Sequence, residues 1–165
     1  MTIMIEQQDA YAVVFDEVRR QSASSPAWLT SLREKAWDRF AELGFPTTKD
    51  EEWRFTNVAP IAKGAFNLSN DGTAELNASA IKPFLFDDGT GLLLVFVDGH
   101  YAARLSSIGS PPKGVRVARL ADAVASHGEL VRHHLAAYAA YRNDAFTALN
   151  TALMTQSRAD WTSKA

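Results

Sequence analysis

The spacing of apolar residues predicts two amphipathic helices near the start of the chain. The first spans about residues 6–22, and the second runs from about 26 to 43. Ser25 before Pro26 is typical of a helix start, with the serine as N-cap. Each helix has one apolar stripe. In the second helix Trp28 and Trp37 flank the stripe, and Arg33 lies on another side. The two stripes are Tyr11, Val14, Phe15 and Val18, and then Leu29, Leu32, Ala36, Phe40 and Leu43. Because each face needs a partner, we expect a helical hairpin.

The stretch 44–57 combines a helix stop, a turn and a new helix start. Gly44 can adopt positive φ after the second helix, and Pro46 prevents the helix from resuming. Thr48 and Glu51 have the spacing of a capping box, in which each side chain accepts from the backbone of the other. Arg54 then has Glu51 or Asp50 as an ion-pair partner, or an aromatic ring on which to stack.

The middle of the chain carries the signals of loops and a small sheet. Residues 63–77 have loop composition, and 77–83 allow one helical turn before Pro83. The continuous apolar run 92–97 predicts a strand buried on both faces. Asp98-Gly99 is a strong hairpin signal, so a return strand is expected at about 100–106. A third short strand is expected at 115–117.

The remaining pattern is helical. One short helix is expected from Leu120 to about His127 and Gly128, and another follows from Leu130. Asn143 or Asp144 can cap a last helix whose stripe is Phe146, Leu149 and Leu153. The fold class is therefore α+β: predominantly helical, with an N-terminal helical hairpin and a small antiparallel β-sheet. We expect one domain, divided into 1–62 (hairpin and capped short helix), 63–91 (loop-rich connection), 92–117 (sheet), 118–154 (helices) and 155–165 (polar tail).

Composition removes several classes of function. A net charge of −2 gives no electrostatic reason to bind nucleic acid or an anionic membrane. The chain has no cysteine, so a disulfide framework and a thiolate-ligated metal or iron–sulfur cluster are excluded. The first residues lack the pattern of a signal peptide, and no apolar run is long enough to span a membrane. We expect a cytoplasmic protein with no bound cofactor.

Two groups of polar residues invite a catalytic or metal-binding interpretation. Asp50, Glu51 and Glu52 form an acidic run, but a capped helix start explains two of the three. His133 and His134 are adjacent, whereas helical metal sites favour i, i+4 spacing. An alternative function is a small hydrolase or transferase using Asp50, Glu51, Arg54 and His100, which would have to converge on one pocket. We assign no catalytic, cofactor-binding or metal-ligating residue and expect no enzyme activity.

Three stretches, in order, resemble a known family. Residues 44–57 read Gly-Phe-Pro-Thr-Thr-Lys-Asp-Glu-Glu-Trp-Arg-Phe-Thr-Asn and follow Leu-Arg-Glu-Lys-Ala-Trp-Asp-Arg-Phe at 32–40. Residues 93–101 and 144–152 resemble a strand with its turn and a later segment of the same family. Together these stretches, over roughly 25–154, are similar to the N-terminal region of the SufB/SufD family of iron–sulfur cluster assembly proteins, in its SufD branch.

The resemblance implies a scaffold protein of the SUF system. Family members continue into a right-handed parallel β-helix, through which SufB and SufD pair, and a C-terminal segment that docks the ATPase SufC. Because this sequence ends before those parts, we expect a non-catalytic interaction domain with SufB and SufC as partners. Strand edges left open by a missing β-helix favour self-pairing, so a homodimer is also expected. A third alternative is a non-functional product of a truncated gene.

Overall fold

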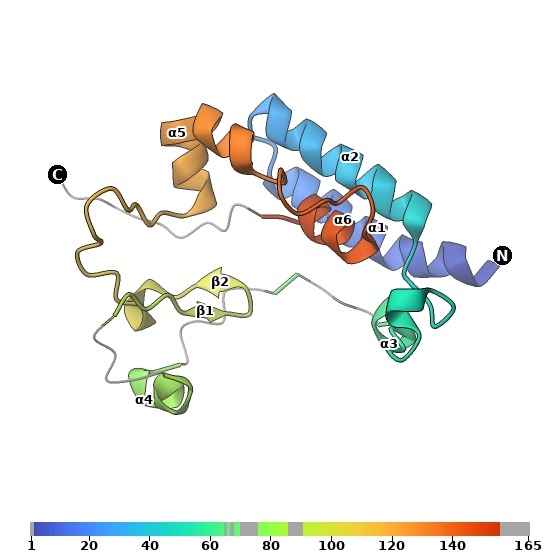
Figure 1. Ribbon diagram of the computed structural model, residues 1–165, viewed down its shortest axis with the longest axis horizontal. Helices are drawn as coiled ribbons and strands as arrows, with labels where there is room; N and C mark the ends of the chain where they lie inside the picture. The colour runs from blue at the N-terminus through green and yellow to red at the C-terminus, as the bar shows by residue number, and fades with distance from the viewer. Residues whose placement is uncertain (1, 65, 67, 70–75, 86–90, 156–165) are drawn as a thin grey trace. The chain divides into compact units, whose positions relative to one another are not determined.

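A computed structural model of the chain describes residues 2–64, 66, 68–69, 76–85 and 91–155, with side chains from residue 10 onward (Figure 1). The chain forms two compact units. Among the described residues, the first unit holds 2–64, 66, 68 and 126–155, and the second holds 69, 76–85 and 91–125. The single domain with five segments stays a prediction, and its polar tail lies outside the described residues from position 156 on.

Three helices of the first unit lie side by side: α1 (Thr2–Gln21), α2 (Ala27–Leu43) and α6 (Ala145–Ala152) (Figure 1). The rings of Phe15 and Trp37 stack face to face at 4.7 Å, which joins α1 to α2. The predicted helical hairpin is therefore present. It is only part of the arrangement, because α6 packs more extensively along α2 than α1 does.

The core of this unit combines large residues from α1 and α2 with small residues from α6. Val18, Leu29 and Phe40 have no exposed surface. From α6, Ala148 and Ala152 are equally buried, and these small side chains let the two helices approach closely. Asp144 caps α6 as predicted, since its Oδ1 accepts a hydrogen bond from the Thr147 amide at 2.6 Å.

Short helical turns follow α2 in the same unit. These are η1 (Glu51–Trp53) and α3 (Ala59–Ala62). The hydroxyl of Tyr11 on α1 donates to the carbonyl of Ile61 at 2.9 Å, which fixes α3 against α1.

The second unit contains α4 (Ala78–Ile81), η3 (Lys82–Phe84) and a two-stranded hairpin. In the hairpin, β1 (Phe96–Val97) pairs antiparallel with β2 (His100–Tyr101), and Val97 faces His100. Asp98 and Gly99 have φ values of 50° and 85°, the positive angles of a type I′ turn. The hairpin predicted from Asp98-Gly99 is confirmed, and so is the antiparallel sheet.

The strands are shorter than the sequence predicts. After β2 the chain turns into η4 (Ala103–Leu105), and its backbone pairs with the first strand again at the bridge between Leu93 and Ser107. Residues 115–117 form no strand, so that prediction is wrong. Burial on both faces of 92–97 is also wrong, because alternate side chains are exposed.

The two helices predicted around His127 are joined as α5 (Leu120–His134), with non-helical backbone angles at His127 (φ −140°, ψ 40°). The predicted break is therefore at the expected residue, although the chain continues in helical geometry on both sides. Ala136, after the end of α5, has a φ of 56°, which an L-residue seldom adopts.

Candidate interaction surface

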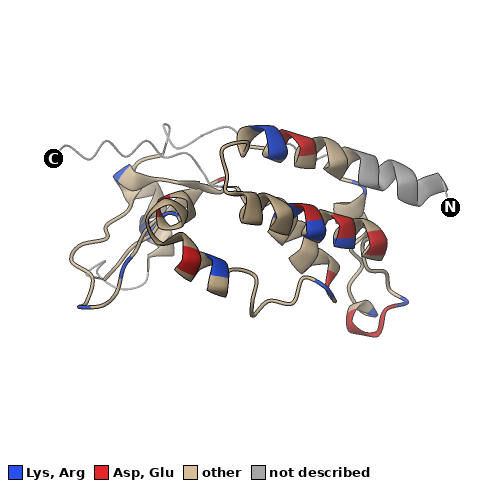
Figure 2. Cartoon of the chain, turned by 90° about the horizontal axis from the view of Figure 1, so that it is seen from above, with Lys and Arg blue, Asp and Glu red and all other residues tan. Residues whose placement is uncertain are grey.

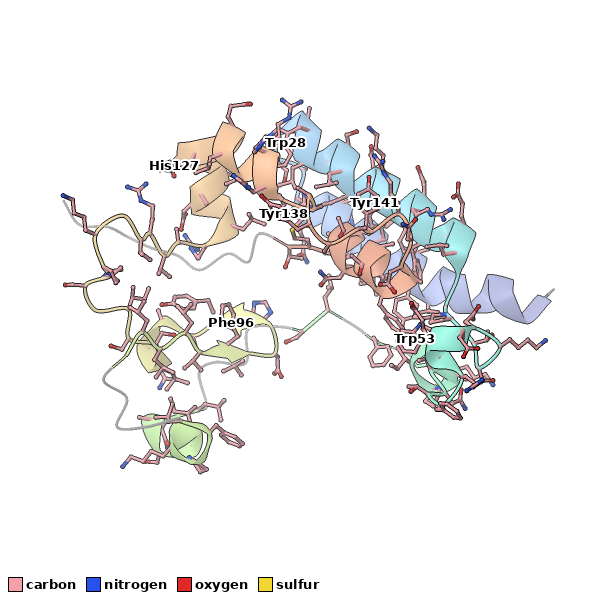
Figure 3. The ribbon with its side chains drawn as sticks, in the orientation of Figure 1. Trp28, Trp53, Phe96, His127, Tyr138 and Tyr141 are labelled. Atoms are coloured by element: carbon pink, nitrogen blue, oxygen red, sulfur yellow. The ribbon has the colours of Figure 1, made fainter. Side chains whose placement is uncertain are left out.

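The segment from Gly44 to Phe55 is held on the core of the first unit at both ends. Gly44 leaves α2 with φ 64° and ψ 180°, and its amide donates to the Phe40 carbonyl at 2.8 Å. The ring of Phe45 then lies 5.1 Å from that of Phe40 and 5.6 Å from that of Phe146. At the other end Trp53 lies 5.2 Å from the same Phe146 ring (Figure 3). The segment is thus a loop anchored by aromatic contacts.

The turn inside this segment is closed by Asp50. Its Oδ2 accepts from the Thr47 amide at 2.7 Å and from the Thr47 hydroxyl at 3.1 Å. These two hydrogen bonds hold the pKa of the Asp50 carboxyl below its ordinary value, because both favour the charged form. The predicted capping box of Thr48 and Glu51 is wrong: Asp50 occupies the N-cap position of η1, and its side chain bonds backward to Thr47.

Beyond the anchored turn, Arg54 and Phe55 project from the first unit, and we call this pair the Arg54–Phe55 knob. The Phe55 ring is 88% exposed. The guanidinium carbon of Arg54 lies 4.6 Å from the centre of that ring, and Nη1 lies 3.4 Å from a carboxylate oxygen of Glu51. Both predicted partners of Arg54 are therefore present.

The knob has the composition of a binding contact. Exposed aromatic and arginine side chains contribute most of the energy in many protein interfaces. Here an apolar ring is presented by a loop anchored to the core. The acidic run Asp50, Glu51 and Glu52 precedes it in the sequence and forms the red loop in Figure 2. A partner could bury the ring and pair a basic group with the acids at its rim.

The four residues of the hydrolase alternative do not lie in one unit. Asp50, Glu51 and Arg54 belong to the first unit and His100 to the second. The His100 ring is hydrogen-bonded through Nε2 to the carbonyl of Ser69 at 2.9 Å, and the Asp50 carboxylate is bonded to Thr47.

The adjacent histidines are exposed at the end of α5. Their rings meet edge to face at 4.9 Å, and His134 Nδ1 is 2.8 Å from the hydroxyl of Tyr138. In the part of the chain that the structure describes, no three His, Cys, Asp or Glu side chains are grouped closely enough to hold a metal ion.

Arg33 is a buried polar residue that the sequence analysis placed on an outer side of α2. Its side chain is in fact buried, at 2% exposure. Nε donates to the carbonyl of Met154 at 2.9 Å, and Nη1 donates to the Ser25 hydroxyl at 3.0 Å. Burial lowers the pKa of the guanidinium, and Nη2 is buried with no hydrogen-bond partner. The sequence did carry a signal for this burial: Arg33 is four residues after Leu29 and three before Ala36, which places it on the apolar face of α2.

The prediction that Ser25 is the N-cap of α2 is wrong. The helix begins at Ala27 with Pro26 in the cap position, and no side chain caps it. The Ser25 hydroxyl instead accepts from Arg33, which connects the start of α2 to the backbone after α6.

The chain is similar to known proteins over most of its length. A family model described as the SufBD protein N-terminal region matches residues 5–157. An iron–sulfur cluster assembly SufBD family protein of Synechocystis sp. is 28% identical over 140 residues, which cover 85% of this chain and 30% of that protein. The chain therefore spans less than a third of the length of this relative. No solved structure matches the chain. Among the described residues, no helix has the length and apolar character needed to cross a membrane.

Proposed function

We propose that this chain, which belongs to the SufBD family and matches the N-terminal region of that family, is a non-catalytic interaction domain of iron–sulfur cluster assembly. The relative from Synechocystis is named for that process, and the match covers most of this chain. We further propose that the chain is of the SufD type, acts in the cytoplasm and has SufB and SufC as partners.

The observation that carries this proposal is the Arg54–Phe55 knob. It lies in the stretch that most resembles the family, and its ring is 88% exposed although the segment before it is fixed on the core. Among the described residues Phe55 is the most exposed large apolar side chain, so it is available to a partner, and its burial there would contribute favourable free energy. Its neighbours Glu51 and Glu52 are exposed acids suited to the polar rim of an interface.

The proposal is tested by a pull-down of the complete chain with purified SufB–SufC. The informative variant is Phe55→Ala, and the matched control is Phe84→Ala, a phenylalanine of the second unit that is 79% exposed. Both substitutions remove an exposed ring and leave the buried core unchanged. If Phe55 anchors the interface, its loss should weaken binding roughly thirty-fold, the effect of losing a central aromatic contact.

Retention of the wild-type chain and of Phe84→Ala, with loss of Phe55→Ala, is the expected result. Equal binding by all three proteins would remove the knob from the interface. No retention of the wild-type chain, with a longer family member retained as the positive control, would refute an independent interaction role for this domain.

A further inference from the structure

Along residues 93–97, which form the first strand of the hairpin and the segment before it, only every second residue makes hydrogen bonds to the return strand. Val95 accepts from the Ala102 amide at 2.9 Å, and its own amide donates to the Ser106 hydroxyl at 2.9 Å. Leu93 exchanges two hydrogen bonds with Ser107, at 2.7 and 2.9 Å. The odd-numbered residues of this strand therefore direct their N–H and C=O groups toward the return strand.

The even-numbered residues direct the same groups to the opposite edge, because successive residues of a strand alternate. Leu94 and Phe96 lie between these hydrogen-bonded residues, so their N–H and C=O groups point away from the hairpin. Neither has a hydrogen bond along this outer edge within the described part of the chain. We call the row formed by Leu92, Leu94 and Phe96 the open edge.

The side chains of the open edge are apolar and exposed. Leu92 is 48% exposed, Leu94 46% and Phe96 59%. Phe96 is labelled on the hairpin in Figure 3. Natural sheets usually protect such an edge with a charge, a proline or a bulge, and residues 91–97 contain neither a charged residue nor a proline. A hairpin of two strands is also marginally stable by itself in water. The edge thus has unpaired backbone groups that one added strand would satisfy, and its apolar side chains would pack laterally against those of the added strand.

We propose that a second copy of this chain pairs antiparallel along the open edge. The edge is self-complementary about Leu94: a two-fold axis there sets Leu94 opposite Leu94 of the second copy and Leu92 opposite its Phe96. Because residues 91–97 carry no charge, this arrangement brings no like charges together. Two hairpins would become one four-stranded sheet, in the mode of strand addition. This inference goes beyond the proposed function, since it concerns self-association and does not involve the Arg54–Phe55 knob.

The first test is amide hydrogen exchange of the complete chain, measured together with its mass by light scattering across a concentration series. The edge between two copies is small, so association should be weak and appear only at high concentration. As the dimer forms, the amides of Leu94 and Phe96 should become protected. In the monomer the amides of Leu93 and Val95 should exchange more slowly than those of Leu94 and Phe96, because the hairpin itself engages them.

Two variants separate pairing at this edge from association elsewhere. Leu94→Pro removes the outward N–H and leaves the hairpin bonds of Leu93 and Val95 in place, as proline is tolerated on edge strands. Leu94→Lys keeps the N–H but places two charges opposite each other across the two-fold axis. The matched control is Leu130→Lys in the first unit, where the leucine is 60% exposed. Each Leu94 variant should weaken dimerisation at least about tenfold, and the control should not.

Protection of the Leu93 amide shows that a variant keeps its hairpin. If Leu94→Pro loses the hairpin, Leu94→Lys still tests pairing at the open edge. A chain that stays monomeric at all concentrations overturns the proposal. So does a dimer that persists in both Leu94 variants. Protection of Leu94 that requires SufB–SufC would also overturn it, because the strand added at the edge would then belong to a different protein.

Discussion

Gly44 and Gly128 should respond in opposite directions to the same substitution by alanine. Gly44 ends α2 with φ 64° and ψ 180°, a combination that is essentially restricted to glycine. Gly128 lies within α5, its φ is not positive, and an added Cβ would have no heavy atom within 4 Å. Backbone conformation alone therefore predicts that one site is strained by a methyl group and the other is not.

The magnitudes follow from these two conformations. Holding an alanine in the Gly44 conformation costs about 1–3 kcal/mol. Relief of that strain would move Phe45, whose ring contacts Tyr11, Phe40 and Phe146, so the core would lose contacts as well. Gly128→Ala removes the entropy cost of a helical glycine and should stabilise the chain by up to about 1 kcal/mol.

The assay is urea or thermal unfolding followed by circular dichroism. For a chain of this size 1 kcal/mol moves the melting temperature by about 2–4 °C, so Gly44→Ala should lower it by roughly 2–12 °C. Gly128→Ala should leave it unchanged or raise it. Equal stability of Gly44→Ala and wild type would refute the reasoning, and so would a loss in Gly128→Ala as large as that in Gly44→Ala.

Three further substitutions test single contacts of the first unit. Phe40→Ala removes a side chain with 0% exposure and should cost roughly 3–5 kcal/mol in urea unfolding, whereas Phe84→Ala, at 79% exposure, should change stability by less than about 0.5 kcal/mol. Tyr11→Phe should cost about 1 kcal/mol through loss of the bond to Ile61. Because burial raises the pKa of Tyr11, the unfolded chain loses this proton first, so the wild type should lose stability as pH rises above 10.0 and Tyr11→Phe should lose less. An NMR titration should give the Asp50 carboxyl a pKa below 3.8, because its hydrogen bonds from Thr47 favour the charged form. Protection of the Thr47 amide should be lost as pH falls through that pKa. In Asp50→Ala this protection should be absent at all pH values.

The elements that the sequence predicted well are those decided by local chemistry. The stripes of α1 and α2 are set by the helical period, and Tyr11, Phe15, Leu29 and Phe40 are buried as their spacing indicates. The turn at Asp98-Gly99 needs two positive φ values, which these residue types favour. Asp144 caps α6 because its side chain reaches an amide three residues on.

The wrong predictions have two causes: competition between local hydrogen-bond partners, and burial that depends on neighbours distant in sequence. Thr48 and Glu51 fit a capping box by spacing, but Asp50 was an equally good acceptor and bonds to Thr47. The apolar run 92–97 could be read as a strand buried on both faces, because apolar identity alone does not say how many surfaces cover a strand. The open edge became visible only once the hydrogen-bonded residues of the hairpin were known. The Arg54–Phe55 knob likewise depends on solvent exposure, which the spacing of apolar residues does not give.

Arg33 shows how a polar residue on an apolar stripe can determine helix packing. Its spacing from Leu29 and Ala36 puts it on the buried face, yet arginine is rarely buried without a partner. The carbonyl of Met154 lies just past the end of α6, where no helical amide is available, and Arg33 Nε supplies the donor. An apolar side chain would pack in the same stripe without the desolvation cost, but it would accept many positions of α6 along α2. The bond from Arg33 Nε to Met154 favours one of these positions, and the bond from Nη1 to Ser25 orients the guanidinium for it. We therefore expect Arg33 to specify the register of α6 on α2 more than it adds to stability.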